Sequence, residues 1–128
     1  MKRVLLIEDE RDIQQVAELA LESFGGYTVE VCSSGAEALE KVVAFAPDLI
    51  LLDVMMPDMD GPATLEALRQ MPELADTPIV FMTAKSQARE IQRFEKLSTL
   101  DVITKPFDPM TLSDQVATIC ENWTGEDE

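Results

Sequence analysis

The sequence contains no histidine, only two cysteines, and far fewer basic than acidic residues. Without histidine, the chain has no imidazole for acid–base catalysis, for metal ligation or for donating a phosphoryl group. Ten lysines and arginines stand against 25 aspartates and glutamates, so the formal charge is -15 and direct binding of nucleic-acid phosphates is disfavoured. Any chemistry must therefore use carboxylates, hydroxyls and lysine.

Long hydrophobic runs are also missing from the sequence. The apolar run that follows the basic start at residues 1–3 ends before Glu8 and is too short for a signal peptide or a membrane span. We therefore expect a cytoplasmic protein. The cysteines, Cys32 and Cys120, lie far apart and form no C-x-x-C motif, so we interpret them as small buried hydrophobic residues rather than as a metal or redox pair.

The apolar residues that are present predict a single domain of alternating strands and helices. The chain has 128 residues, of which 46% are hydrophobic, enough for one compact core. Five short apolar runs predict strands at residues 4–7, 27–32, 49–52, 79–82 and 100–103. We assign residues 1–124 to this domain and expect the acidic residues 125–128 to fray.

Apolar residues at helical spacing predict helices that pack on the sheet, at Ile13, Val16, Ala17, Ala20 and Phe24 and at Leu112, Val116, Ile119, Cys120 and Trp123. Ser34 and Glu37 form the pattern of a capping box for a second helix. Pro62 and Pro109 suit the first turns of the third and fifth helices, and a fourth helix is expected over residues 86–97. This alternation indicates an open α/β domain with a parallel sheet covered on both faces.

Polar residues stand at the carboxyl ends of four predicted strands, where such sheets bind ligands. They are Glu8, Asp9, Asp53, Thr83 and Lys105. Taken singly, an acid or threonine after a strand is usually a helix cap, and a lysine before proline is usually a surface residue. Their occurrence at four strand ends together favours a functional site.

These residue types suit phosphoryl transfer. If the first and third strands are neighbours, Glu8, Asp9 and Asp53 converge and repel one another unless a hard divalent cation such as Mg²⁺ joins them. The hydroxyl of Thr83 and the charge of Lys105 could then hold phosphoryl oxygens beside the metal. A carboxylate nucleophile that accepts a phosphoryl group is chemically consistent with this set.

With these residues at the strand ends, the chain resembles the receiver domain of bacterial two-component response regulators over essentially its whole length. The motifs that carry the resemblance are Leu6-Ile7-Glu8-Asp9, Asp53-Val54-Met55-Met56-Pro57-Asp58-Met59-Asp60-Gly61, Thr83-Ala84 and Lys105-Pro106-Phe107. The resemblance implies a CheY-like, flavodoxin-like fold, in which a doubly wound five-stranded parallel sheet has the strand order 2-1-3-4-5 and helices on both faces.

The same resemblance implies roles for individual residues. Asp53 is the phosphoacceptor, Asp9 and Asp53 ligate Mg²⁺ with the carbonyl of Met55, and Glu8 supports the metal through water. Thr83 binds the phosphoryl group and Lys105 pairs with it.

Two sites depart from the family pattern. Val102 stands where the family often has an aromatic gate, and residues 98–99 are Ser-Thr where a Gly-Ala pair commonly ends the fourth helix.

One face of the expected fourth helix is basic, because it carries Lys85, Arg89, Arg93 and Lys96. This face is either simply solvated or a docking surface beside Phe94.

The sequence thus predicts a phosphorylation-controlled signalling switch that accepts a phosphoryl group on Asp53 from a histidine kinase or a phosphotransfer protein. The family's output face, formed by the fourth helix, fifth strand and fifth helix, would then contact a downstream protein. The alternatives are a magnesium-dependent phosphohydrolase, an interaction module with a vestigial site, and a receiver cut from a longer regulator with a DNA-binding or enzymatic output domain. Against the hydrolase, the position two residues after Asp53 is Met55 rather than an acid.

Overall fold

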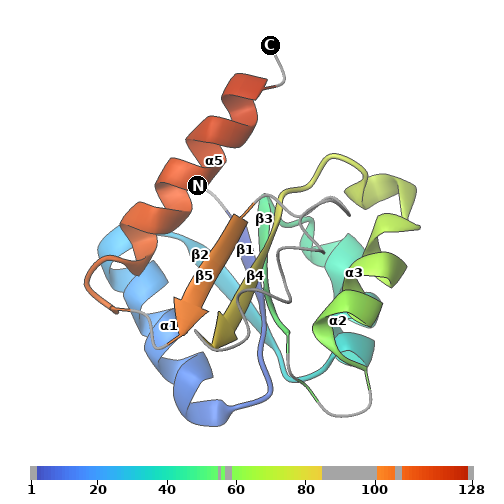
Figure 1. The fold of residues 1–128 in the computed structure, drawn as a ribbon, viewed down its shortest axis with the longest axis horizontal. Coiled ribbons are helices and arrows are strands. Elements are labelled where there is room, and N and C mark those ends of the chain that lie inside the picture. The colour runs from blue at the N-terminus through green and yellow to red at the C-terminus, as the bar shows by residue number, and fades with distance from the viewer. Residues whose placement is uncertain (1–2, 55, 57–58, 85–100, 106–107, 127–128) are drawn as a thin grey trace.

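The computed structural model describes residues 3–54, 56, 59–84, 101–105 and 108–126. These residues form the predicted five-stranded parallel sheet, and its strand order β2-β1-β3-β4-β5 is the one that the family resemblance implies (Figure 1). The elements are β1 (Arg3–Ile7), α1 (Arg11–Gly25), β2 (Thr28–Cys32), α2 (Gly35–Phe45), β3 (Leu49–Asp53), α3 (Gly61–Arg69), the short 3-10 helix η1 (Pro72–Leu74), β4 (Ile79–Ala84), β5 (Asp101–Lys105) and α5 (Leu112–Glu126).

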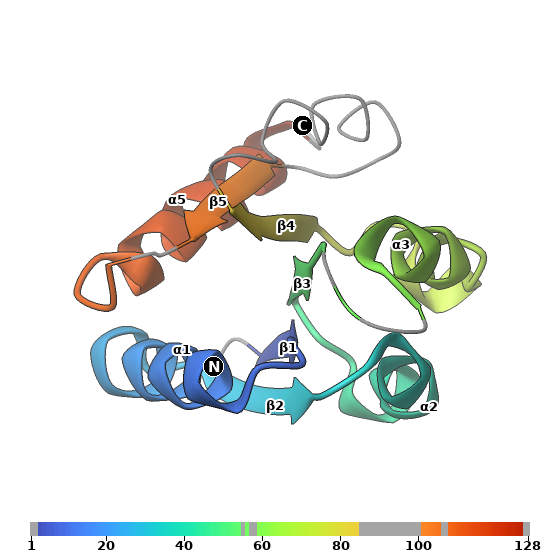
Figure 2. The same cartoon turned by 60° about the horizontal axis from the view of Figure 1, so that its bottom comes forward.

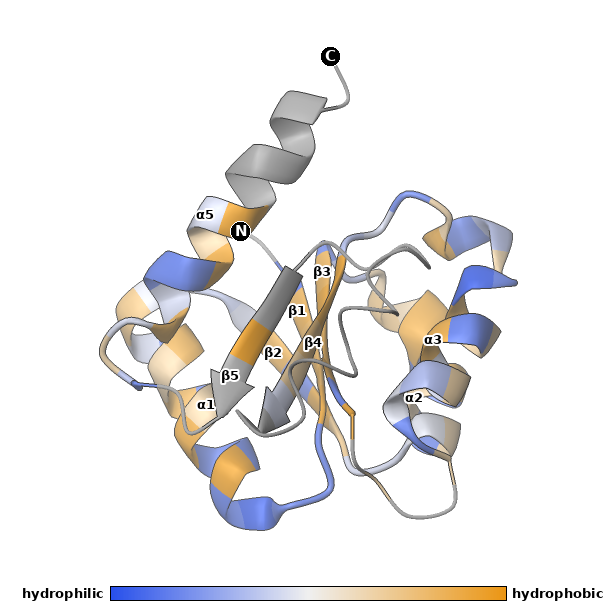
Figure 3. Ribbon diagram, in the orientation of Figure 1, coloured by the Kyte–Doolittle hydropathy of each residue, from blue (hydrophilic) through white to orange (hydrophobic). Residues whose placement is uncertain are grey.

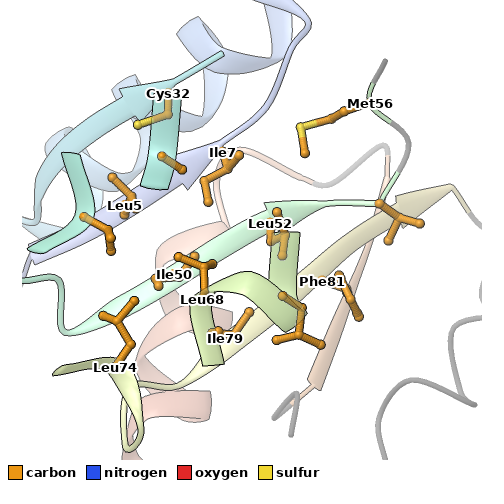
Figure 4. Close-up of a cluster of buried hydrophobic side chains, with 14 residues drawn as sticks. Leu5, Ile7, Cys32, Ile50, Leu52, Met56, Leu68, Leu74, Ile79 and Phe81 are labelled. Carbon is orange, nitrogen blue, oxygen red and sulfur yellow. The ribbon is translucent and has the colours of Figure 1, made fainter. Parts of the chain in front are cut away.

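Helices cover both faces of the sheet. Figure 2 shows α1 and α5 on one face and α2 and α3 on the other. Each face has its own hydrophobic core, because successive residues of a strand point to opposite sides. Leu5, Ile50, Leu52 and Phe81 belong to the core beneath α2 and α3, part of which Figure 4 shows. In Figure 3, β1 and β3 are accordingly coloured as hydrophobic over most of their length.

The ends of several elements differ from the sequence prediction. β4 continues through Thr83 to Ala84, and β5 extends to Lys105, because the two strands remain paired up to the Ala84–Lys105 partners. The helix predicted to contain Pro109 begins only at Leu112. Pro109 lies in the preceding turn, where the Asp108 carbonyl accepts hydrogen bonds from the backbone N–H groups of Thr111 and Leu112, both at 3.0 Å.

The buried stripe of α1 also differs from the prediction. Ala17, Ala20 and Leu21 are buried against the sheet, whereas Val16 is 43% exposed and Phe24 is 55% exposed. Helical spacing alone cannot separate residues at the centre of the buried face from residues on its border. The small side chains of Ala17 and Ala20 allow α1 to lie close to the sheet. The predicted packing of Val16 and Phe24 is therefore wrong. In α5, Leu112, Val116 and Ile119 are buried as expected.

Helix α2 has the predicted Ser34 cap. The hydroxyl oxygen of Ser34 accepts a hydrogen bond of 3.1 Å from the backbone N–H of Glu37. The carboxylate of Glu37 reaches one residue further back than in an ordinary capping box, and accepts a 2.7 Å bond from the backbone N–H of Ser33. This bond fixes the loop between β2 and α2 at the edge of the sheet where the acidic residues lie.

Candidate metal centre

Glu8, Asp9 and Asp53 lie together at the carboxyl end of the sheet, as the sequence predicts. Ile7, the last residue of β1, is the register partner of Leu52 in β3, so the residues that follow each of them leave neighbouring strands at the same level. One carboxylate oxygen from each of the three acids lies within 4.8 Å of the others.

The burial of this acidic cluster is unequal. Glu8 is 0% exposed and Asp53 is 2% exposed, while Asp9 is the most accessible of the three. Carboxylates so close together repel strongly where protein excludes water, and a hard cation with oxygen ligands relieves that repulsion. The donor set fits Mg²⁺, because an all-oxygen site open to solvent on one side leaves room for the waters that this ion retains.

Backbone hydrogen bonds fix the position of Glu8. Its backbone N–H donates to the carbonyl of Cys32 in β2 at 3.0 Å, which continues the ladder one residue past β1. Its carboxylate accepts a 3.0 Å bond from the backbone N–H of Glu10, at the start of α1. The buried acid is thus held by its own strand end and by the loop that carries Asp9.

The loop after Asp53 folds back onto the end of β3. The backbone N–H of Val54 donates to the carbonyl of Met82 at 3.2 Å, and that of Gly61 donates to the carbonyl of Val54 at 2.8 Å. Asp60 then caps α3 by accepting a 2.9 Å bond from the backbone N–H of Ala63. The backbone that follows Asp53 is therefore fixed by hydrogen bonds to β4 and to the start of α3.

The remaining predicted site residues are placed only in part. Thr83 is 1% exposed in β4 and directly follows Met82, the register partner of Asp53, so it lies at the same edge of the sheet. Lys105 is the last residue of β5 and pairs with Ala84, but its side chain lies outside the described part of the chain. Met55 lies outside it as well.

The predicted fourth helix and the basic stripe of Lys85, Arg89, Arg93 and Lys96, together with Phe94, fall within residues 85–100, which the structure does not describe. The side chain of Val102 also lies outside the described residues.

Cys32 has the properties of a structural cysteine. It is 0% exposed at the end of β2. Burial, with a smaller contribution from the nearby charge of Glu37, raises the pKa of its thiol to about 11. Since the thiolate is the reactive form, this thiol is inert at neutral pH. The interpretation of Cys32 as a buried hydrophobic residue is therefore confirmed.

Comparison with known proteins identifies relatives across the chain. The family model of the response regulator receiver domain matches residues 4–117. The response regulator MprA of Mycobacterium ulcerans is 39% identical over 106 residues, covering 82% of this chain and 44% of that protein. The alkaline phosphatase synthesis transcriptional regulatory protein PhoP of Bacillus subtilis is 37% identical over 118 residues, covering 92% of this chain and 48% of that protein.

Among solved structures, the chemotaxis protein CheY4 of Vibrio cholerae is similar with a TM-score of 0.86 and 31% identity, covering 93% of this chain and 98% of that one. The chain thus spans about half the length of the curated relatives named above and nearly all of CheY4. Within the part of the chain that the structure describes, no helix is both long and apolar enough to cross a membrane.

Proposed function

The chain belongs to the receiver-domain family of response regulators, and from that premise we propose that it is a phosphorylation-dependent switch whose phosphoacceptor is Asp53. The phosphoryl donor is a histidine kinase or a histidine phosphotransfer protein. The observation that carries this proposal is the meeting of Glu8, Asp9 and Asp53 within 4.8 Å at the carboxyl end of the sheet.

In the proposed reaction, a carboxylate oxygen of Asp53 attacks the phosphorus of the donor in line with the bond that breaks. A phosphorus–oxygen bond forms on Asp53, the phosphorus–nitrogen bond of the donor histidine breaks, and its electron pair returns to the imidazole. The nearly complete burial of Asp53 supports this role, because low solvent access strengthens every charge interaction with the transferred group.

We assign the metal to Glu8, Asp9, Asp53 and the carbonyl of Met55, with Glu8 acting through water. Bound Mg²⁺ would supply positive charge to the carboxylates and to the transferred phosphoryl oxygens. The hydroxyl of Thr83 donates to one phosphoryl oxygen and the ammonium group of Lys105 pairs with another. The roles of Met55, Thr83 and Lys105 rest on the family motifs, and the place of Thr83 beside the register partner of Asp53 supports its assignment.

The partners and cellular setting follow from the same premise. We propose that phosphorylation alters the output face that the family resemblance assigns to the fourth helix, expected over residues 86–97, together with β5 and α5, and that this face contacts a downstream protein. The formal charge of -15 supports output through protein contacts rather than direct nucleic-acid binding. We place the switch in the cytoplasm, with residues 1–124 as the receiver unit and residues 125–128 as its acidic tail.

The test uses acetyl phosphate as a small-molecule donor and intact-mass spectrometry as the readout. With Mg²⁺, we expect the chain to gain one phosphoryl group, Asp53→Asn to gain none, and Asp12→Asn, which changes an exposed acid in α1, to label like the wild type. Full labelling of Asp53→Asn, or labelling that is independent of Mg²⁺, would contradict the proposal. Sustained turnover of p-nitrophenyl phosphate would identify a phosphohydrolase instead.

A further inference from the structure

The carbonyl group of Glu8 stands where the ladder between β1 and β2 ends. The last bond of that ladder is donated by the backbone N–H of Glu8 to Cys32. Beyond Cys32 the chain leads into Ser34, the N-cap of α2. A side chain from α1 reaches the Glu8 carbonyl at this place: the amide nitrogen of Gln14 donates a hydrogen bond to it.

The same amide nitrogen makes a second contact. Nε2 of Gln14 lies 3.1 Å from the hydroxyl oxygen of Ser33, in the loop between β2 and α2. A backbone carbonyl can only accept hydrogen bonds, so the atom of Gln14 that faces Glu8 must be the nitrogen. One amide group therefore joins the loop after β1 to the loop after β2.

The Ser33 end of this bridge is itself fixed. The backbone N–H of Ser33 donates to the carboxylate of Glu37 at 2.7 Å, and Lys41 forms a 2.7 Å ion pair with the other oxygen of that carboxylate. The amide of Gln14 is thus held against a braced loop rather than against a free surface hydroxyl.

The geometry of the peptide bond carries this restraint to Asp9. The carbonyl of Glu8 and the backbone N–H of Asp9 belong to one planar unit, so fixing the carbonyl direction restricts the direction in which the side chain of Asp9 leaves the backbone. Glu8 and Asp53 are almost fully buried, whereas Asp9 is the most accessible acid of the cluster. Asp9 is therefore the acid whose orientation depends most on such support.

We propose that Gln14 is a positioning residue of the cation site, which orients Asp9 through the Glu8–Asp9 peptide without touching the cation. The inference rests on the proposed Mg²⁺-dependent phosphorylation of Asp53 and adds a residue that the family motifs quoted above do not contain. Because Asp9 acts on the metal alone, whereas the nucleophile is Asp53, loss of Gln14 should weaken Mg²⁺ binding while leaving the reaction at saturating Mg²⁺ almost unchanged.

The experiment compares the full wild-type chain with Gln14→Met, which keeps the length of the side chain and removes its donor. The matched control is Gln15→Met, at the next and exposed position of α1. Mg²⁺ affinity is measured by isothermal titration calorimetry, and the rate of labelling by acetyl phosphate is measured over a range of Mg²⁺ concentrations. We expect Gln14→Met to raise the Kd for Mg²⁺ roughly tenfold, as losses of ligand-orienting hydrogen bonds do elsewhere. We expect its labelling rate at saturating Mg²⁺ to stay within about twofold of the wild type, because the nucleophile is untouched.

Three outcomes of the comparison between Gln14→Met and Gln15→Met would overturn the inference. The first is an unchanged Kd in Gln14→Met, and the second is an equal rise in Gln15→Met. The third is a Gln14→Met rate at saturating Mg²⁺ that falls as far as the affinity does, which indicates general disruption of the fold. If Gln14→Met does not fold, Ser33→Ala replaces it, and a Kd equal to that of the wild type would then overturn the inference. Failure of the wild type itself to bind Mg²⁺ or to be labelled would overturn the proposed function as a whole.

Discussion

Gly61 lies directly against the backbone of Asp53. A Cβ atom added at Gly61 would stand 2.7 Å from the carbonyl oxygen of Asp53 and 2.7 Å from the Cα atom of Val54. Both contacts are with backbone, which cannot move aside as the end of a flexible side chain can. The glycine therefore allows the loop after β3 to close onto the strand that carries Asp53, the proposed phosphoacceptor.

Replacing Gly61 by alanine should destabilise the fold and disturb the site together. The added methyl group must push the end of β3 away from the start of α3, at a cost of about 1 to 3 kcal/mol in the free energy of unfolding. The rate of Asp53 labelling by acetyl phosphate should fall as well, since Asp53 is displaced. Urea denaturation measures the first effect. Ala63→Ser, at an exposed position in the same turn of α3, is the control, and equal stabilities of the two variants would contradict the argument.

Arg69 should be important for stability although it lies far from the acidic cluster in the chain. Its Nη1 atom donates to the carbonyls of Leu74 and Thr77, both at 2.7 Å, and so closes the segment between α3 and β4. Burial lowers the pKa of its guanidinium group, and the nearby charge of Asp76 opposes that shift. Even so, arginine remains protonated at neutral pH.

We expect Arg69→Met to lower the free energy of unfolding by about 2 to 3 kcal/mol, because two carbonyls lose a charged donor. Arg69→Lys should recover only part of this loss, since one ammonium group cannot reproduce the fork of a guanidinium. Arg11→Met, at an exposed position in α1, serves as the control in thermal and urea unfolding. If Arg69→Met were as stable as the Arg11→Met control, the carbonyls of Leu74 and Thr77 would have found other donors at little cost.

More of the fold than of the candidate site could be predicted from the residues alone. The apolar runs around Leu5, Leu51 and Val80 are buried on both faces of the sheet, and such runs indicate central parallel strands directly. The meeting of Glu8 with Asp53 depends on the pairing of β1 with β3, which periodicity alone does not determine and which the family motifs supplied. The register then brings the two acids to the same level.

Other features leave little signal in the sequence. Val16 and Phe24 occur at helical spacing, yet both are exposed, because spacing cannot tell the centre of a buried stripe from its border. Gln14 reads as an ordinary polar residue of an amphipathic helix. Its proposed positioning role becomes visible only in three dimensions, where its amide group contacts both the loop after β1 and the loop after β2.

Glu37 should make the stability of the protein depend on pH. The hydrogen bond from Lys41, followed by that from the backbone N–H of Ser33, lowers the pKa of Glu37 below its ordinary value of 4.5. A carboxyl group with a lowered pKa in the folded state stabilises the fold above its unfolded pKa and loses that contribution as the pH falls through the folded value. The contribution should therefore be present at neutral pH and absent in strong acid.

The measurement is the difference in free energy of unfolding between the wild type and Glu37→Gln at several pH values. Glu37→Gln should be less stable than the wild type at about pH 7, and the difference should shrink as the pH falls below about 4. Glu40→Gln removes the same charge from an exposed position of α2 and controls for the net charge. A difference that grows as the solution becomes more acidic would have the wrong sign for this argument.

The acidic cluster itself should cost stability when no cation is bound. Three carboxylate oxygens within 4.8 Å repel one another, and two of the three acids are almost fully buried. Replacing Asp9 by asparagine keeps the shape of the side chain and removes one of these charges. We expect Asp9→Asn to raise the free energy of unfolding by about 1 to 3 kcal/mol in solutions containing EDTA, as expected for like charges at this separation.

Added Mg²⁺ should make the wild type more stable than Asp9→Asn, which reverses their order in EDTA. The wild type should gain stability as the Mg²⁺ concentration rises, because the ion binds the folded state through charges that the unfolded chain does not hold together. Asp9→Asn should gain much less, since it has lost a ligand. Thermal unfolding with EDTA and with increasing Mg²⁺ follows both effects, and Glu10→Gln, an exposed neighbour whose side chain caps nothing, provides the matched control. If Asp9→Asn were less stable than the wild type without metal, the acids would be held by attractive contacts within the fold, and the repulsion that makes this cluster suited to a cation would be absent.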